Sequence, residues 1–387
     1  MRRSLLLFAL SAAIAPAVIA PAAALAQSSQ LSVSGLGIPG RGLSVRSWAL
    51  GGSAAIFDGE SSLNPAALAS VPMTTATLTS VEDFRSIESP AGDASTRSVL
   101  FPQFAVAGGF RDRPIFLGVN YSSYMVRDYT FGLVDTIVLR DAPVEVGDTF
   151  SSRGGLGDIQ FGVGYRLGTK WSAGVGVHFI TGSNRLTVGR GFGDSSYVGT
   201  SQRVETSYSG AGISVGVMGQ LARSLGFAAV ARTDGHLNVH RGDVDDGSVD
   251  LPYSFAAGLG WQPMPKLQLN SQVRASTWSG ANSDLLARGE AGAKNTIEAS
   301  FGGEFVSDPR RPYRRPIRFG VRYATLPFLF GDAANDQPHE VSVSIGSGTR
   351  FAEGRAGFDL ALERLSRSAG SFSERAWLLV AGVTVRP

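Results

Sequence analysis

The sequence of 387 residues contains no cysteine. A disulfide framework, a lipid anchor on cysteine, a zinc–thiolate site and a cysteine nucleophile are therefore excluded. A surplus of charge is lacking as well, because 35 lysines and arginines face 32 aspartates and glutamates. A chain with so small a basic surplus cannot neutralise many phosphates, so we expect no nucleic-acid partner.

Long hydrophobic runs are confined to the N-terminus. There, Arg2 and Arg3 precede an apolar run that ends in Ala24-Leu25-Ala26, which is the pattern of a secretory signal peptide and its cleavage site. We therefore predict a signal peptide over residues 1–26 and an exported mature chain. No later run approaches the roughly 20 apolar residues of a membrane helix. The mature chain is thus either soluble or spans a membrane as a closed barrel.

From about residue 73 the sequence alternates between apolar residues and polar or small ones, and helical periodicity is nearly absent. In one stretch Trp171, Ala173, Val175, Val177 and Phe179 alternate with Ser172, Gly174, Gly176 and His178. Many of the 49 glycines fall inside such strands rather than in turns. Glycine within a strand costs stability unless another segment must approach closely, so these positions indicate that something packs against one face.

Turn signals alternate between tight and loose connections along the chain. Six tight ones, such as Gly168-Thr169-Lys170, and seven looser ones, such as residues 129–153, together predict 14 strands. The strands are expected to start near residues 73, 97, 114, 154, 170, 203, 225, 251, 266, 294, 317, 338, 355 and 374. An even strand number with short turns on one side and long loops on the other is typical of an outer-membrane β-barrel. A soluble protein with several sheets is the alternative, because its strands also alternate.

Three segments resemble the long-chain fatty-acid transporter family of outer-membrane proteins (FadL/TodX-like). The first runs from Ala49-Leu50-Gly51-Gly52 to Asn64-Pro65-Ala66-Ala67-Leu68-Ala69, and the others are Leu251–Trp278 and Ile317–Phe328. The resemblance implies an all-β fold: a 14-stranded antiparallel transmembrane β-barrel with an N-terminal plug in its lumen. It also implies that hydrophobic molecules bind on the outer side and leave laterally into the bilayer. On this basis we expect a plug over residues 27–72 and a barrel over residues 73–387.

Within the expected plug, Asn64 and Pro65 predict the start of a short helix, because Asn favours the N-cap and Pro the first helical position. We place the gate at Gly51, Gly52, Asp58, Asn64, Pro65 and Ala66. Asp58 and Glu60 are expected to pair with lumen arginines, for which Arg166, Arg318 and Arg322 are the candidates on polar faces. The alternative is that these charges are solvated in a water-filled interior.

Other residues invite functional hypotheses outside the plug. The long connection 129–153 predicts an outer entrance loop with exposed Leu139, Val144 and Val146; a hairpin packed over the barrel mouth is the alternative. His178 lies on a polar face and could serve as a hydrolytic base, but no nucleophile is indicated beside it. The acidic residues of 243–250 would allow weak cation binding, against the default of a solvated loop.

Taken together, these features predict a channel for passive uptake of hydrophobic small molecules, such as long-chain fatty acids, gated by the plug. We expect no enzyme activity, no cofactor and no metal site. The expected partners are outer-membrane lipid and a hydrophobic ligand, and the expected oligomeric state is a monomer. The alternative from another class is a PorV-like barrel that binds an exported protein in secretion, or serves as a surface scaffold, without small-molecule transport.

Overall fold

The computed structural model describes residues 29–387, apart from 62, 72, 90–91, 243, 291, 309–313 and 331–335. The predicted signal peptide, residues 1–26, lies outside the described residues. Among the described residues, the helices are all too short or too polar to cross a membrane.

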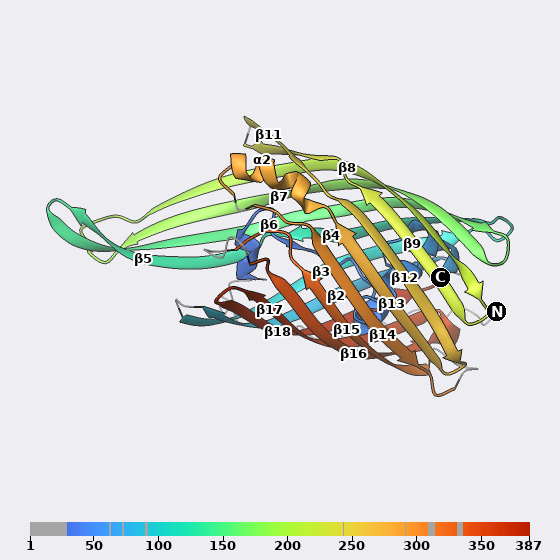
Figure 1. Cartoon of the computed structure of the whole chain (residues 1–387). Helices are drawn as coiled ribbons and strands as arrows, with labels where there is room; N and C mark the ends of the chain where they lie inside the picture. The colour runs from blue at the N-terminus through green and yellow to red at the C-terminus, as the bar shows by residue number, and fades with distance from the viewer. Residues whose placement is uncertain are drawn as a thin grey trace, which may run out of the picture.

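A closed antiparallel β-barrel makes up most of the chain (Figure 1). Eighteen strands form one sheet, and four of them (β1, β5, β10 and β11) stand outside the barrel circuit, which leaves the 14 strands predicted. The circuit closes where β18 pairs with β2, for example at Val380 and Val81. Its strands are β2 (Thr75–Ser89), β3 (Gly92–Gly109), β4 (Ile115–Val126), β6 (Ala142–Leu167), β7 (Trp171–Phe192), β8 (Thr200–Ala222), β9 (Leu225–Thr233), β12 (Tyr253–Met264), β13 (Leu267–Ser276), β14 (Thr296–Phe305), β15 (Arg314–Thr325), β16 (His339–Phe351), β17 (Ala356–Ala369) and β18 (Phe372–Val385).

The alternation in the sequence maps onto the two faces of the barrel wall. Along β7, Val175, Val177 and Phe179 are exposed, whereas Gly176 and His178 between them are buried. The exposed side chains form an apolar outer belt, and the buried ones face a filled interior. A closed barrel with an apolar outer face satisfies every backbone polar group within a bilayer, so this is a transmembrane barrel.

Three strands of the barrel are much longer than the rest. β6, β7 and β8 have 26, 22 and 23 residues, and they extend far beyond the other strands in Figure 1. β5 (Tyr129–Leu139) forms a hairpin with the start of β6. β10 (His236–Arg241) and β11 (Val244–Asp250) form a second hairpin, in which β10 pairs with β8, and α2 (Asn282–Ala287) lies near β11. The long connections therefore all rise at one end, and the short turns lie at the other.

The expected entrance loop is this first hairpin rather than an open loop. Leu139 is half-buried at its turn, but Val144 and Val146 are buried, so the expectation that both are exposed is wrong. The reason is that residues 129–153 continue the two-residue alternation and pair along β5 and β6. Val144 and Val146 fall on the inward face of that pairing.

The N-terminal segment 29–71, here called the plug, lies inside the barrel. Its elements are η1 (Gln30–Val33), β1 (Ile38–Pro39), α1 (Val45–Ala49), η2 (Ala55–Phe57) and η3 (Pro65–Ser70). α1 contacts β15 to β18, η2 contacts β9 and β12, and η3 contacts β4, β6, β7 and β8. The plug thus touches the wall on opposite sides, and its short elements fit because the inner face of the wall is thin.

A plugged lumen and an opening in its wall

Asn64 and Pro65 begin a helix, as predicted, although it is a 3-10 helix rather than an α-helix. The side-chain oxygen of Asn64 accepts a hydrogen bond from the backbone N–H of Ala66 at 3.0 Å, and its amide nitrogen donates to the carbonyl of Ile56 at 2.8 Å. Asn64 is therefore both the cap of η3 and a tie to η2. A cap of this kind satisfies a backbone donor that would otherwise be buried without a partner.

Glycines of the wall make room for this helix. A Cβ at Gly174 would overlap the backbone of Pro65 and Ala66, and one at Gly216 would overlap the Asn64 amide. Gly320 meets the backbone of Leu50 and Gly51 in the same way on the opposite side. The mid-strand glycines are thus the contact surface for the plug.

Gly51 and Gly52 form the turn after α1. Both have positive φ, +65° and +87°, a conformation that residues with a Cβ rarely adopt. A Cβ at Gly51 would also lie 2.9 Å from the backbone of Val321. This turn therefore needs glycine both for its conformation and for its approach to β15.

Among the described residues no lumen arginine forms an ion pair with Asp58, so the expectation that it pairs with Arg166, Arg318 or Arg322 is wrong. Its carboxylate accepts hydrogen bonds from the hydroxyls of Ser44, Ser47 and Ser61 and from the backbone N–H of Glu60. Ser44 is the N-cap of α1, which places the carboxylate beside the first turn of that helix. Asp58 therefore joins separate parts of the plug through these hydrogen bonds. Its position is also favourable because carboxylates are stabilised near helix N-termini.

In most ion pairs between plug and wall the charges are reversed from the expected arrangement, in which the plug supplies the carboxylate. Arg41 pairs with Glu363 at 2.7 Å, and Arg46 forms a bidentate ion pair with Glu304, with N···O distances of 2.9 and 3.0 Å. In both cases the plug supplies the cation and the wall the carboxylate. Glu60 is the exception, since its carboxylate lies 3.1 Å from Arg386, just beyond β18.

The three lumen arginines predicted from the sequence do face inward, but their partners differ. Arg166 donates to the carbonyl of Ala69 at 2.6 Å, and this is its contact with the plug. Arg318 pairs with Glu304 and Asp359, and Arg322 pairs with Glu298 and Glu340, all on the wall. Arg318 therefore shares Glu304 with Arg46 of the plug.

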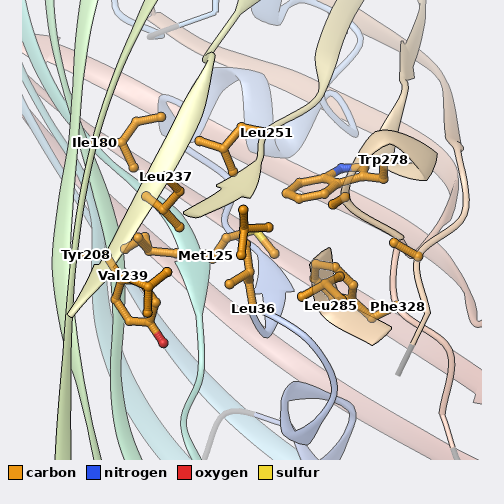
Figure 2. Close-up of a cluster of buried hydrophobic side chains, with 14 residues drawn as sticks. Leu36, Met125, Ile180, Tyr208, Leu237, Val239, Leu251, Trp278, Leu285 and Phe328 are labelled. Atoms are coloured by element: carbon orange, nitrogen blue, oxygen red, sulfur yellow. The ribbon is translucent and has the colours of Figure 1, made fainter. Parts of the chain in front are cut away.

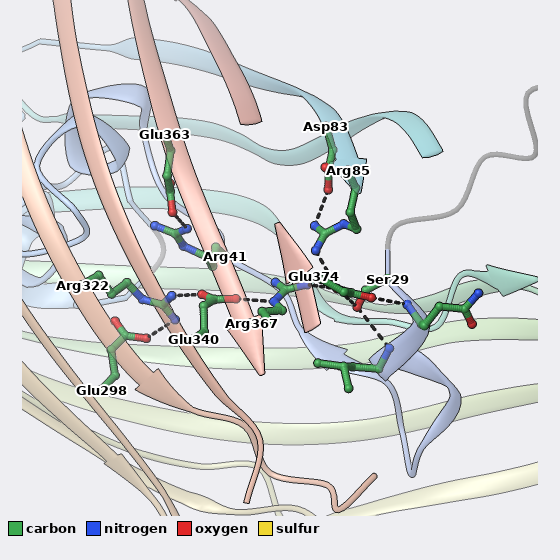
Figure 3. A network of polar contacts seen from close by, with 12 residues as sticks. Ser29, Arg41, Asp83, Arg85, Glu298, Arg322, Glu340, Glu363, Arg367 and Glu374 are labelled. Atoms are coloured by element: carbon green, nitrogen blue, oxygen red, sulfur yellow. Dashed lines mark hydrogen bonds and ion pairs between the residues drawn. The ribbon is translucent and has the colours of Figure 1, made fainter. Parts of the chain in front are cut away.

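A chain of buried ion pairs crosses the inner wall from β15 to β2 (Figure 3). Glu340 links Arg322 to Arg367, and Glu374 links Arg367 to Arg85. Glu374 also accepts hydrogen bonds from the hydroxyl of Ser29 and the backbone N–H of Gln30, at 2.6 and 2.7 Å. The first described residues of the plug are thus held by this network.

Glu60 occupies an unusual electrostatic position in the plug. Burial raises its pKa from 4.5 to about 7, and the nearby Asp58 carboxylate adds to the rise, although Arg350 and Arg386 oppose it. Desolvation and a like charge both disfavour the ionised carboxyl. Glu60 therefore changes its charge near neutral pH.

The barrel wall opens between β3 and β4. In the described ladder these strands pair only from Gln103–Ser122 to Gly109–Phe116. Pro102, which has no N–H to donate, stands where the pairing ends, and β3 carries a bulge there against β2. β4 has a bulge at the same level, between Ser123 and Met125. Beyond this level, β4 pairs instead with β1 of the plug, at Met125–Pro39 and Val126–Ile38.

A small cavity of about 80 Å³ fills this opening. Its lining is largely apolar and comes from β3 and β4, from the plug and from the neighbouring strands: Ile38, Pro39, Trp48, Val81, Leu100, Pro102, Val126, Leu365 and Leu378. Four charged side chains also line it: Arg41, Asp83, Arg85 and Arg367. A second cavity of about 120 Å³ lies in the lumen, and its lining is mixed. Apolar side chains such as Leu43, Met125 and Trp278 line part of it, and the rest carries charged side chains: Arg41, Asp158, Arg232, Asp234, Arg274, Glu298, Arg322 and Glu340. Residues 38–41 line both cavities, so β1 and the residues after it form the partition between lumen and opening.

An apolar cluster lies between the plug and the outer hairpins (Figure 2). Leu36 of the plug and Met125 of β4 meet Leu237 of β10, Trp278 and Phe328 there. Trp278 and Met125 also line the lumen cavity. The outer end of the lumen is therefore apolar, whereas its middle carries the ion pairs.

His178 has a hydrogen-bonded serine that the sequence did not indicate. Its Nδ1 lies 2.9 Å from Asp158, and its Nε2 lies 2.9 Å from the Ser214 hydroxyl. The connectivity is that of a hydrolytic triad, but Ser214 is only 1% exposed and none of the described cavities includes it. Asp158 is also paired with Arg232 at 2.6 Å. The chain links β6, β7, β8 and β9 rather than offering a reactive hydroxyl.

The acidic segment 243–250 is partly described, since Asp243 lies outside the described residues. Asp246 pairs with Arg241 and Arg288, and Asp250 pairs with His236. These carboxylates are engaged by arginine and histidine side chains, and weak cation binding there stays an untested expectation.

A protein-family model named BamG matches residues 8–239. The match spans more than half of the 387 residues. The chain belongs to the BamG family. No curated protein matches the sequence.

Solved structures share this fold over most of the chain. A FadL homologue from Pseudomonas aeruginosa aligns with a TM-score of 0.63 at 14% identity, covering 90% of this chain and 99% of that chain. The toluene transporter TbuX from Ralstonia pickettii gives a TM-score of 0.57 at 14% identity, covering 89% and 98%. The toluene transporter TodX from Pseudomonas putida gives 0.54 at 14% identity, covering 89% and 98%. The expected FadL/TodX-like architecture is therefore confirmed, and identities this low show the fold alone.

Proposed function

We propose that this protein lets hydrophobic small molecules, such as long-chain fatty acids, cross the outer membrane passively and leave through the opening between β3 and β4. One observation carries the proposal: residues 38–41 separate a lumen cavity from a largely apolar opening in the barrel wall. The barrel acts as a monomer, and residues 1–26 are removed as a signal peptide on export.

The route begins at the apolar cluster beneath the outer hairpins. A hydrophobic molecule would displace part of the contacts around Leu36 and Trp278 and reach the lumen cavity. The apolar side chains of this cluster suit the hydrophobic part of such a ligand, and the charged lining of the lumen cavity suits a polar group such as a carboxylate. Its presence would shift the plug toward a conformation in which β1 has left β4, and no energy input is needed for such a population shift.

The opening suits exit into lipid because its rim is apolar on the outer face. Val99, Phe101 and Phe104 of β3 are exposed there, at 56%, 60% and 46%. A molecule leaving between β3 and β4 would pass from a cavity whose lining is largely apolar to an apolar surface. The charged side chains on that path, such as Asp83, Arg85 and Arg367, are held in ion pairs.

Locking β1 to β4 tests the proposal. The chain has no cysteine, so the pair Ile38→Cys and Val126→Cys places one disulfide between β1 and β4 without competing thiols. We expect uptake of labelled oleate or toluene by cells expressing this variant to fall on oxidation and to recover on reduction. The control pair Leu78→Cys and Val383→Cys joins β2 and β18 on the outer face and should leave uptake unchanged. Unchanged uptake with β1 fully cross-linked to β4 would contradict the proposal.

The extended hairpins favour a second function, the binding of an exported protein in secretion or at the cell surface. β5 pairs with β6 along its length, its start contacts η1 of the plug, and over residues 131–139 no described ladder engages its other edge. Leu133, Val134 and Val138 of this strand are 56%, 76% and 71% exposed. An exposed strand edge with apolar side chains can receive a strand from another chain.

Removing the hairpin separates the two functions. Replacing residues 130–151 by a short glycine–serine link should leave uptake intact if the barrel is a channel. Co-purification of one defined exported protein with the intact chain, lost in the shortened one while uptake is absent from both, would favour the scaffold.

A further inference from the structure

Basic residues gather at the end of the barrel that carries the short connections. Each of the six connections there, or the strand end adjoining it, carries an exposed basic side chain: Arg111, Lys170, Arg223, Lys266, Arg315 and Arg355. The acidic residues in the described parts of these connections are Asp112, Asp308 and Glu353. We call the six basic residues the basic rim.

The basic rim differs from the opposite end of the molecule in how its charges are used. No ion pair within the described residues engages the side chains of the rim. At the other end, by contrast, exposed arginines such as Arg185, Arg190 and Arg375 pair with Glu205, Asp148 and Glu88. The rim therefore presents cationic groups that the chain itself does not neutralise.

The rim stands at the edge of the apolar outer belt. Phe110 precedes Arg111 and is 54% exposed, and Trp171 follows Lys170 and is 40% exposed. Met264 and Phe351 flank the rim in the same way, at 52% and 54%. Aromatic and large apolar side chains at such positions mark the membrane interface. The cationic groups are thus at headgroup level.

The rim also surrounds the barrel. The short connections join successive strand pairs around the closed circuit, so their charges are spread over the whole circumference. A protein partner would contact one sector of such a ring, whereas a lipid leaflet contacts all of it. The distribution therefore fits a membrane surface.

We propose that the basic rim binds the phosphates of anionic glycerophospholipids in the leaflet around the short-connection end. Guanidinium groups form two-pronged hydrogen bonds with phosphate oxygens, and ammonium groups add point charges. Basic side chains beside an anionic leaflet gain binding energy roughly in proportion to their number. Such contacts hold this end of the barrel at a fixed depth and orient it in the membrane.

Lipid retention by the full-length protein tests this. The purified protein is placed in nanodiscs that contain equal amounts of phosphatidylglycerol and phosphatidylcholine, and the lipids retained on its release are measured by native mass spectrometry. We expect phosphatidylglycerol to be enriched, and the variant Lys170→Gln/Arg223→Gln/Lys266→Gln to lose about twofold or more of that enrichment. Each single substitution should contribute a part of the loss, because the charges lie in separate sectors.

A matched variant at the opposite end serves as the control. Arg185→Gln/Arg190→Gln/Arg375→Gln removes the same number of exposed charges and should retain the enrichment. Heat-modifiable migration in gels confirms that each variant is a folded barrel. Equal losses in both variants, or enrichment that survives the rim variant, would overturn the proposal. So would complete loss on one rim substitution, which would indicate a single lipid site, or binding of acidic soluble protein without phosphatidylglycerol enrichment.

Discussion

The carboxylate of Glu60 in the plug lies 3.1 Å from the guanidinium of Arg386, the residue after β18 is complete and one before the end of the chain. The same carboxyl has a pKa raised to about 7 by burial and by Asp58. The plug is therefore tied to the barrel at a point where protonation is finely balanced. Glu60 also contributes its backbone carbonyl, which accepts a hydrogen bond from the Gln103 amide at the edge of the wall opening.

The first prediction concerns pH. A carboxyl whose pKa is raised on docking favours the docked plug when protonated, so docking weakens as pH rises from the ordinary value of 4.5 through about 7. We expect the conductance of reconstituted barrels to increase between about pH 4.5 and pH 7. In Glu60→Gln this increase should disappear, with the plug docked at both values. Conductance of Glu60→Gln that still rises with pH would show that another group is responsible.

The second prediction concerns the ion pair of Arg41 and Glu363, which joins the segment after β1 to β17. Glu363 is buried, and the Arg41 guanidinium also lies 3.8 Å from the centre of the Trp48 ring. Glu363→Leu leaves the cation buried without its partner, which should reduce the free energy of unfolding by about 3 kcal/mol. Because Arg41 follows β1, leak through the barrel should also increase.

The double variant Arg41→Met/Glu363→Leu removes both charges and distinguishes pairing from packing. We expect it to recover most of the lost stability in urea unfolding, since an apolar pair often replaces a buried ion pair at little cost. Arg375→Met, which disrupts an exposed pair with Glu88, should change stability by about 0.5 kcal/mol or less. A double variant as unstable as Glu363→Leu would indicate that the loss arises from packing.

Much of the barrel could be predicted because its signals are local. A strand needs only alternating side chains and a turn, and 12 of the 14 expected strand starts lie within three residues of the observed ones. β6 is the main exception, since it begins at Ala142 rather than near 154. The turn before it, Arg140 and Asp141, has positive φ at both residues, +50° and +65°. Such turns usually carry Asn-Gly or Asp-Gly, and Arg-Asp is not such a pair, so the hairpin could be stated only as an alternative for residues 129–153.

The partners of the plug could not be predicted, because they depend on position along distant strands. Arg46 and Glu304 are separated by 258 residues. Alternation shows that a side chain faces the lumen, but not at which height or opposite which strand. The predicted charges were also reversed, because the plug supplies Arg41 and Arg46 while the wall supplies the carboxylates. Asp58 follows a serine-rich helix start, and its hydroxyl partners Ser44 and Ser47 were the available local signal.

The third prediction tests the fit between η3 and the wall. A Cβ at Gly174 overlaps the backbone of Pro65 and Ala66, whereas one at Gly189 on the same strand meets nothing within 4 Å. Gly174→Ala should therefore displace η3 and raise conductance, with a loss of about 1–3 kcal/mol in the free energy of unfolding. Gly189→Ala should leave both quantities nearly unchanged. Similar behaviour of the two variants would mean that the close approach at Gly174 does not hold the plug.

The fourth prediction concerns the plug as a whole. Deleting residues 47–71 removes α1 after its second residue, η2 and η3, but leaves β1 and the wall with all its strands. The barrel closes through its own ladder, from β2 to β18, so we expect the shortened chain to fold. Its lumen should conduct, because nothing then fills the space between Gly174 and Gly320. Heat-modifiable migration checks folding, and single-channel recordings check the conductance. A folded barrel with the conductance of the intact protein would show that residues 47–71 do not block the lumen.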